Sequence, residues 1–275
     1  MPHFICTTCG TQYGESAAAP ETCPVCEDAR QFTPVTGQGW TTLERMRLTH
    51  VNAFRRYEPG LFGIGTFPHF AIGQRALLLR TPGGNVLWDC ISLLDDATVE
   101  IVQAFGGLAA IAVSHPHFYT TMAEWAHAFA APVYVHAADR RWVMRPDAAI
   151  RFWEGETKEL LPGVTLIRAG GHFPGATVLH WKDGAAGRGV LLSADIAQVA
   201  RDRKSVSFLW SYPNMIPLPQ SVVERIAGRI ARFPFDAVYG IFWDLVIPKD
   251  GSAIVARSAE RYIRAITGEG LEGEG

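Results

Sequence analysis

Residues 110–117 read Ala-Ile-Ala-Val-Ser-His-Pro-His, an apolar run that ends on two histidines. Pro116 disfavours helix at the preceding residue, so His115 should continue the extended backbone of a strand. His115 and His117 are two positions apart, and on extended backbone their imidazoles project from the same side. The segment therefore predicts a strand with two metal-binding side chains at its C-terminal end, where α/β folds place their sites.

Two further polar motifs follow predicted strands. Gly-Gly-His172-Phe-Pro-Gly comes after a predicted strand at residues 164–168, and Asp195 ends the apolar run Val-Leu-Leu-Ser-Ala. Three histidines and one carboxylate are a ligand set suited to zinc or iron. We therefore expect one metal ion bound by His115, His117 and His172, with Asp195 in or beside its first ligand sphere.

The rest of the sequence interleaves strands and helices. A helix is expected at residues 41–57, capped by Thr41 or Thr42, and strands follow between residues 61 and 88. Further helices are expected near residues 93–105, 120–130, 219–232 and 252–266, and further strands near 109–113, 132–135, 164–168, 177–181, 189–193 and 237–242. This alternation predicts an α/β or α+β fold with two sheets.

The N-terminus carries a second candidate metal site, made of two Cys-x-x-Cys units, Cys6–Cys9 and Cys23–Cys26. Paired units of this kind, in a chain without a recognisable export signal, indicate a metal site rather than disulfides. Four thiolates can close a tetrahedron around zinc or iron, and we expect zinc. The segment is too short for an apolar core of its own, so metal binding should supply much of its folding free energy.

These features predict three parts of the chain. Residues 1–40 are expected to form the cysteine module and a linker, and residues 41–268 the main domain. Residues 269–275, part of a run of glycine and glutamate, are expected to be a disordered tail. Gly10 directly follows the first cysteine pair, where the turn around a metal often requires a positive φ.

Both regions resemble known families. Cys-Thr-Thr-Cys-Gly and Cys-Pro-Val-Cys resemble the knuckles of rubredoxin-like and zinc-ribbon modules over residues 3–33. The order of motifs in residues 58–268 resembles the metallo-β-lactamase fold superfamily: Asp89 matches its first aspartate, Ser-His115-Pro-His117 the start of its H-x-H-x-D-H motif, Gly-His172-Phe-Pro-Gly its third motif, and Ser-Ala-Asp195 its bridging aspartate. The resemblance implies a four-layer αββα sandwich in which Asp89 braces the metal-binding loops.

The sequence departs from this family where the second metal would bind. Tyr119 and Thr120 stand in place of the aspartate and histidine that follow H-x-H, and the late strand ending Ile-Phe-Trp243 lacks the last family histidine. Of the second site's ligands only Asp195 remains, which is too few because zinc sites use three or four protein ligands. We therefore expect a single-metal centre. Nothing in the sequence places Asp244 at the vacated position.

One metal is enough for hydrolytic chemistry. A zinc ion with three protein ligands and an open position lowers the pKa of its bound water to about 7. The sequence therefore favours a metal-dependent hydrolase acting on a small-molecule ester, lactone or thioester, with Asp195 and Tyr119 as candidate catalytic residues. Tyr119 has too high a reference pKa, about 10, to act as a base, but it can donate a hydrogen bond to an oxyanion. The alternative role for Tyr119 is an ordinary wall of the pocket.

Two other functions stay open at this stage. One is a mononuclear iron oxidoreductase of the sulfur-dioxygenase type, with His115, His172 and Asp195 as the iron ligands and the cysteine module as an electron carrier. The other is a degenerate family member that binds but does not catalyse. The identity of the metal distinguishes the iron enzyme from the hydrolase.

Composition excludes several other classes. With 25 basic and 27 acidic residues the formal net charge is −2, which argues against nucleic acid or an anionic membrane as a partner. Apolar residues make up 48% of the chain, yet we find no run of the ~20 that a membrane span requires. The first residues also lack the features of a signal peptide. We expect a cytoplasmic protein.

Overall fold

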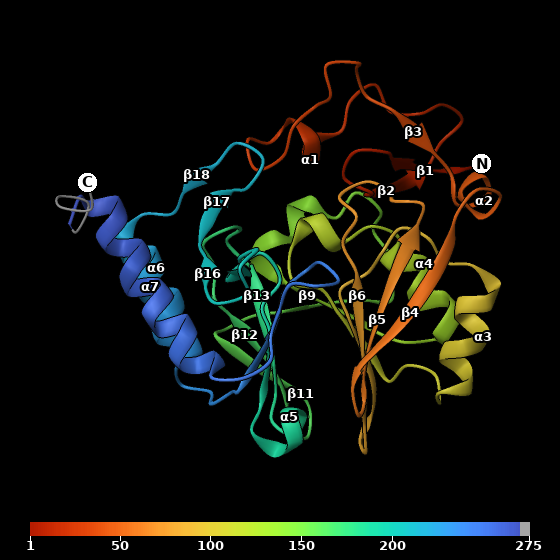
Figure 1. Ribbon diagram of the computed structural model, residues 1–275. Coiled ribbons are helices and arrows are strands. Elements are labelled where there is room, and N and C mark those ends of the chain that lie inside the picture. The colour runs from red at the N-terminus through yellow and green to blue at the C-terminus, as the bar shows by residue number, and fades with distance from the viewer. Residues whose placement is uncertain (270–275) are drawn as a thin grey trace. The chain divides into compact units, whose positions relative to one another are not determined.

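The computed structural model describes residues 1–269 (Figure 1). The chain divides into two compact units, Met1–Glu154 and Gly155–Gly275. The expected tail lies outside the described residues except for Glu269. Across residues 1–269, none of the helices is both long enough and apolar enough to cross a bilayer.

The first unit begins with the cysteine module. Its three-stranded sheet has the order β2-β1-β3, with β1 at His3–Cys6, β2 at Gln12–Glu15 and β3 at Trp40–Thr41. The short helix α1 (Pro24–Glu27) starts at Pro24, where a proline costs no hydrogen bond. Because β3 follows the predicted linker and pairs with β1, residues on both sides of that linker belong to one sheet.

The helix predicted for residues 41–57 is wrong beyond its first turns. Helix α2 covers only Leu43–Arg47, capped by Thr42, whose side chain accepts a hydrogen bond from the Arg45 amide. Residues Val51–Glu58 form strand β4 instead. The apolar residues fit helical spacing, but pairing with β5 (Leu61–Phe67) across a Pro-Gly turn outweighs that local pattern.

The larger sheet of the first unit has seven strands in the order β10-β9-β8-β7-β6-β5-β4. Its remaining strands are β6 (Ala76–Thr81), β7 (Gly84–Trp88), β8 (Ala110–Ala112), β9 (Val133–His136) and β10 (Ile150–Trp153). Strands β4 to β7 pair antiparallel, whereas β7 to β10 pair parallel.

Parallel pairing requires crossover connections, and helices provide the first two of the three. Helix α3 (Asp96–Ala104) joins β7 to β8, and α4 (Met122–Phe129) joins β8 to β9, both on the same face of the sheet (Figure 1). The C-terminal ends of β7 and β8 therefore meet at one edge of the sheet. Those ends carry Asp89 and the Ser114–His117 segment.

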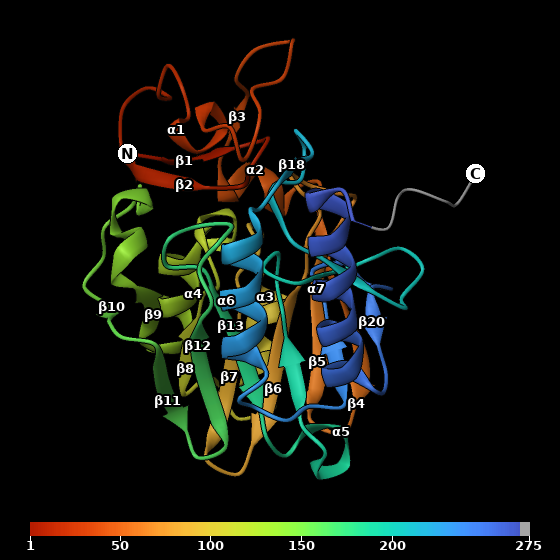
Figure 2. The same cartoon turned by 90° about the vertical axis from the view of Figure 1, so that its left-hand side faces the viewer.

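The second unit is built on a six-stranded sheet with the order β11-β12-β13-β14-β19-β20. Its strands are β11 (Thr157–Leu161), β12 (Val164–Arg168), β13 (Thr177–Trp181), β14 (Val190–Leu192), β19 (Ala237–Tyr239) and β20 (Val246–Ile247). Helices α6 (Gln220–Ile230) and α7 (Gly251–Thr267) run side by side (Figures 1 and 2). The short helix α5 (Gly184–Gly187) connects β13 to β14.

Two small ribbons complete this unit after β14. They consist of β15 (Gln198–Val199) with β16 (Val206–Ser207), and of β17 (Leu209–Ser211) with β18 (Ile216–Pro217). Both follow Asp195 in the chain, so they can hold the loop on which Asp195 lies. The interleaved helices and several sheets confirm the predicted mixed α/β class.

Candidate metal centres

The four cysteines converge as the spacing predicts. The sulfurs of Cys6 and Cys26 are 3.5 Å apart and those of Cys9 and Cys23 are 3.6 Å apart, and all four lie within 4.8 Å of one another. All four are buried free thiols. A zinc ion with sulfurs at about 2.3 Å in a tetrahedron requires sulfur separations of about 3.8 Å. The donor set and its dimensions therefore fit a four-thiolate metal ion.

Hydrogen bonds to sulfur support this reading. The backbone amides of Thr8 and Cys9 donate to the Cys6 sulfur at 3.4 Å, and the Gln38 side-chain amide donates to it at 3.0 Å. The Tyr13 hydroxyl donates to Cys23 at 3.0 Å. Hydrogen bonds from the neighbouring cysteine side chains lower the pKa of Cys6, whereas burial raises that of Cys9, so Cys6 loses its proton to a metal more readily than Cys9 does. Sequence reasoning missed Tyr13 and Gln38 because neither lies within a cysteine pair.

The turn after the first cysteine pair confirms the role expected for Gly10. Its φ is +82°, in the left-handed region that glycine tolerates. A Cβ at this position would lie 2.5 Å from the Ser92 hydroxyl oxygen, which itself donates to the Gly10 carbonyl at 3.0 Å. Gly10 is thus needed both for the turn and for the close approach of the module to the Ser92 loop.

His115 and His117 follow β8, as predicted. His115 has extended backbone, while Pro116–Phe118 form a single 3₁₀ turn. The two imidazole centroids are 5.1 Å apart, and both side chains are buried. The Nδ1 atom of His115 is hydrogen-bonded to the Ser114 hydroxyl at 2.8 Å, which fixes the ring and leaves Nε2 for a metal.

Two side chains from other loops hold the backbone of this histidine segment. Asp89 accepts a hydrogen bond from the Ser114 amide at 2.7 Å, so it braces the segment as its resemblance to the family aspartate implies. Gln74, in the connection between β5 and β6, donates its side-chain amide to the His117 carbonyl at 3.1 Å. Sequence reasoning missed Gln74, which belongs to no motif.

In the second unit, His172 is anchored by main chain. Its Nδ1–H donates to the Trp210 carbonyl at 2.9 Å, because a carbonyl can only accept. That bond places the proton on Nδ1 and leaves the Nε2 lone pair for a metal, as in many metal-binding histidines. Trp210 lies on β17, and sequence alone gave no indication that this strand reaches His172.

Asp195 is held by the same ribbon. The Tyr212 hydroxyl donates to the backbone carbonyl of Asp195 at 2.9 Å and to that of Ser207 at 3.2 Å. The Tyr212 ring also meets His172 edge to face, with centroids 5.8 Å apart. Burial, and then the charge of Asp195, raise the pKa of Tyr212, so its hydroxyl stays a donor at neutral pH. One ribbon therefore positions both predicted ligands of this unit.

The predicted metal set is thus divided between the units, with His115 and His117 in the first and His172 and Asp195 in the second. Each pair is buried, and His115 and His172 each have Nδ1 engaged by a neighbour. These features fit metal-binding imidazoles. That all four side chains bind the same ion stays a prediction.

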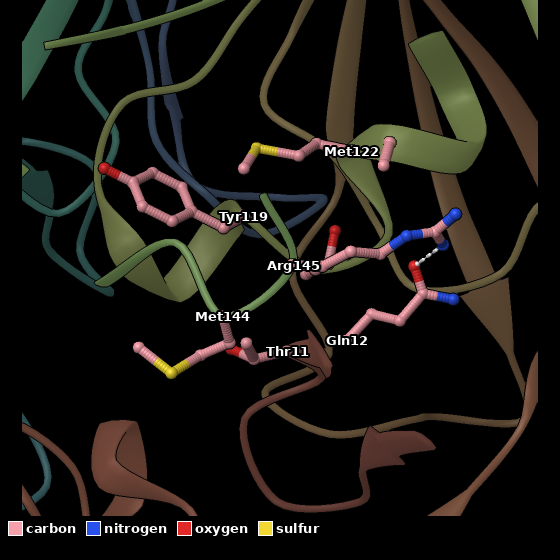
Figure 3. Close-up of a pocket in the computed structure, with 8 residues that line it drawn as sticks. Thr11, Gln12, Tyr119, Met122, Met144 and Arg145 are labelled. Atoms are coloured by element: carbon pink, nitrogen blue, oxygen red, sulfur yellow. Dashed lines mark hydrogen bonds between the residues drawn. The ribbon is translucent and has the colours of Figure 1, made fainter. Parts of the chain in front are cut away.

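Tyr119 and Thr120, which replace two family ligands, lie in the turn before α4. Tyr119 is 2% exposed, and burial, followed by the charge of Asp139, raises its pKa, so it stays protonated well above neutral pH. It helps line a small pocket beside Gln12 and Arg145. Figure 3 shows its hydroxyl pointing away from these two side chains.

The remaining candidates have simple placements. Trp243 and Asp244 lie in the connection between β19 and β20. Cys90 is fully buried, and burial raises the pKa of its thiol, in agreement with its expected role as a small apolar side chain.

Comparison with known proteins gives one near relative by sequence. No protein-family model matches the chain. The chain is 48% identical over 271 residues to the uncharacterized protein YmaE of Bacillus subtilis strain 168, and the match covers 98% of each chain.

Solved structures resemble the chain at low sequence identity. The DIM-1 metallo-β-lactamase matches with a TM-score of 0.59 and 14% identity, covering 78% of this chain and 98% of its own. FIM-1 from Pseudomonas aeruginosa, a metallo-β-lactamase solved in its mono-zinc form, matches with a TM-score of 0.56 and 13% identity over 76% and 95% of the two chains. TTHA1623, solved in a di-iron-bound form, matches with a TM-score of 0.52 and 23% identity over 72% and 98%.

Proposed function

Since the chain belongs to the family of the Bacillus subtilis protein YmaE and has the metallo-β-lactamase fold, we propose that it is a metal-dependent hydrolase with one metal ion at its histidine and aspartate site. The ligands are His115, His117 and His172, with Asp195 in or beside the first ligand sphere. The substrate is a small molecule with an ester, lactone or thioester group.

One observation carries this proposal: the hydrogen bond from His172 Nδ1 to the Trp210 carbonyl. A metal-binding histidine needs its proton held on the other ring nitrogen, so that the ligating nitrogen keeps its lone pair. His115, whose Nδ1 is held by Ser114, repeats the arrangement in the other unit. The structure thus supports Nε2 of both rings as the metal-binding atom.

The residues that stand where a second metal would bind favour a single ion. Tyr119 has no lone pair suited to zinc while its hydroxyl stays protonated, and burial keeps it so. Thr120 offers only a neutral hydroxyl. A related fold accommodates one metal, since FIM-1 was solved in a mono-zinc form.

The chemistry follows from the groups that surround such an ion. A bound zinc supplies Lewis acidity and a water that is deprotonated near neutral pH. Asp195 adds a carboxylate that can accept a proton or a hydrogen bond beside the reacting group. Tyr119 supplies a neutral donor suited to an oxyanion. Burial of the histidine ligands excludes bulk water, which strengthens each of these interactions.

We assign zinc to the four-cysteine site as well, where it has a structural role. All four positions of its tetrahedron are filled by sulfur, so no open position remains for a substrate. The second candidate function is a mononuclear iron oxidoreductase, and iron as its metal is supported by TTHA1623, which has this fold and was solved in a di-iron-bound form. A thiol or persulfide would then be the substrate and oxygen the oxidant.

Metal analysis of protein purified without added metal tests the proposal. We expect two zinc equivalents per chain, and hydrolysis of at least one member of a panel of nitrophenyl esters, lactones and thioesters. His172→Ala should lose one equivalent together with that activity. Iron at the histidine site with oxygen consumption on a persulfide would replace the hydrolase by the oxidoreductase. Zinc at the cysteines alone would leave a noncatalytic protein.

A further inference from the structure

The cysteine module reaches the backbone of the loop that follows His117. The backbone amide of Gln12, on β2 of the module, donates to the Thr120 carbonyl at 3.1 Å. Thr120 is three residues beyond His117 and has a φ of +32°, outside the regions that a threonine prefers. A non-glycine residue keeps such a conformation only where its surroundings impose it. The module supplies one of the bonds that do so.

The Gln12 side chain forms a second connection, which Figure 3 displays in part. Arg145 donates to the Gln12 side-chain oxygen at 2.5 Å and to the Glu124 carboxylate at 2.5 Å. The side-chain amide of Gln12 donates to the same carboxylate at 3.2 Å. Each member of this triad therefore bonds to the other two. Glu124 lies on α4, the helix that begins directly after the Thr120 turn.

A third connection runs through the Ser92 loop. The Ser92 hydroxyl donates to the Gly10 carbonyl, and the Thr121 hydroxyl donates to the carbonyls of Ile91 and Ser92 at 3.0 and 3.1 Å. Thr121 precedes α4, so the module, the Ser92 loop and the start of α4 form one hydrogen-bonded group. On the module side these bonds begin at Gly10 and Gln12, which lie one and three residues after Cys9.

We propose that the cysteine module is a positioning element of the histidine site and that Gln12 is its contact residue. Metal binding by the cysteines fixes the turn from Cys9 to Gln12, and Gln12 in turn fixes the Thr120 turn and the start of α4. The histidine segment is thereby held ready for its own metal. The two metal sites are coupled: occupancy of the cysteines raises the affinity of the histidines. This inference rests on the proposed metal site at His115 and His117.

Cobalt(II) substitution in the full chain tests the coupling, because it reports the two sites separately. Thiolate ligands give intense sulfur-to-cobalt charge-transfer absorption, which imidazole and carboxylate ligands lack. Gln12→Ala removes the triad but no ligand. We expect its cobalt affinity at the histidine site to fall roughly tenfold, the usual effect of losing a residue that orients ligands. The charge-transfer band should stay unchanged, and amide hydrogen exchange in residues 117–125 should become faster.

Gln38→Ala is the matched control. Gln38 is the same residue type in the same module, but its amide donates to the Cys6 sulfur and the Gly39 carbonyl. Its effect should be confined to the charge-transfer band. Should Gln12→Ala fail to fold, Arg145→Met disrupts the same triad from outside the module and should give the same result.

The outcomes separate this inference from the proposed function. If the unmodified chain binds cobalt only at the cysteines, the proposed function fails. If it binds at both sites and Gln12→Ala leaves histidine-site affinity and hydrogen exchange unchanged, the coupling is overturned and the proposed function stands.

Discussion

The two candidate metal sites differ in how the chain builds them. The cysteine site takes all its ligands from residues 6–26, in one unit, and its sulfurs accept hydrogen bonds from the surrounding loops. The ligands proposed for the other site come from residues 115–195, in two units, and main chain and side chains hold them individually. A closed site made from one short segment suits folding, whereas a site made from separate strand ends can keep a position open for chemistry.

The largest effect should come from removing one ligand of the four-cysteine site. Cys23→Ser should lose one metal equivalent and destabilise the chain on the order of 4 kcal/mol, because metal binding replaces an apolar core in the module. Metal analysis and urea denaturation measure the two effects. The same substitution at Cys90, which lies outside both sites, should leave the metal content at its original value. An unchanged metal content in Cys23→Ser would mean that the cysteines hold no ion.

Removing a ligand of the second site should affect activity before stability. His172→Ala should reduce hydrolysis at least about a hundredfold, since metal chemistry contributes several kcal/mol to such reactions. The thiolate site should keep its ion. Turnover and metal content are measured on the same preparation. His180→Ala, which removes another buried histidine of this unit, is the control for a general loss of structure. Hydrolysis that survives without the second ion would contradict the assignment.

A smaller effect is expected from the ribbon that holds His172 and Asp195. Tyr212→Phe removes one hydroxyl that serves two carbonyls, so the free energy of unfolding should fall by about 1–3 kcal/mol. Urea denaturation measures that fall. If Tyr212 also positions Asp195, the pH profile of turnover should shift while the metal content stays constant. A change in neither quantity would show that the ribbon is held by its other contacts.

The smallest effect concerns pH. Although burial opposes ionisation of Glu124, its hydrogen bond and attraction to Arg145 lower its pKa below the usual range. A depressed pKa stabilises the folded chain above the unfolded value of about 4.3, and this contribution disappears as pH falls through the folded pKa. Relative to Glu124→Gln, the natural chain should lose a few tenths to about 1 kcal/mol below pH 4. Parallel stability curves for the two proteins would exclude this ion pair as a source of stability.

Sequence reasoning succeeded where chemistry depends on neighbours in the chain. The two cysteine pairs, the strand that precedes His115 and the capping by Thr42 all follow from local spacing. Strands β12 and β13 also match their predicted ranges, because their apolar runs are bounded by turn residues.

Sequence reasoning failed where contacts between residues distant in the chain determine the structure. Val51 and Phe54 fit a helical face, yet β5 draws them into a strand. Trp210 holds His172 through its backbone carbonyl, a group that every residue has. The tryptophan side chain therefore gave no indication of this contact. Gln12 and Gln74 were missed for a related reason: an isolated glutamine belongs to no motif, and only the folded chain shows which backbone or side chain it reaches.

The small apolar cluster beneath the module has a consequence for how such a chain can be shortened. Ile5 of β1 packs with Leu43, Met46 and Leu93, so part of the core of the module lies beyond the linker. Deleting residues 1–40 would expose those partners to water and remove the strand that β3 pairs with. The boundary suggested by composition is therefore not a place to cut. In evolutionary terms, a lineage that lost the module would have to rebuild the surface that Ile5 covers.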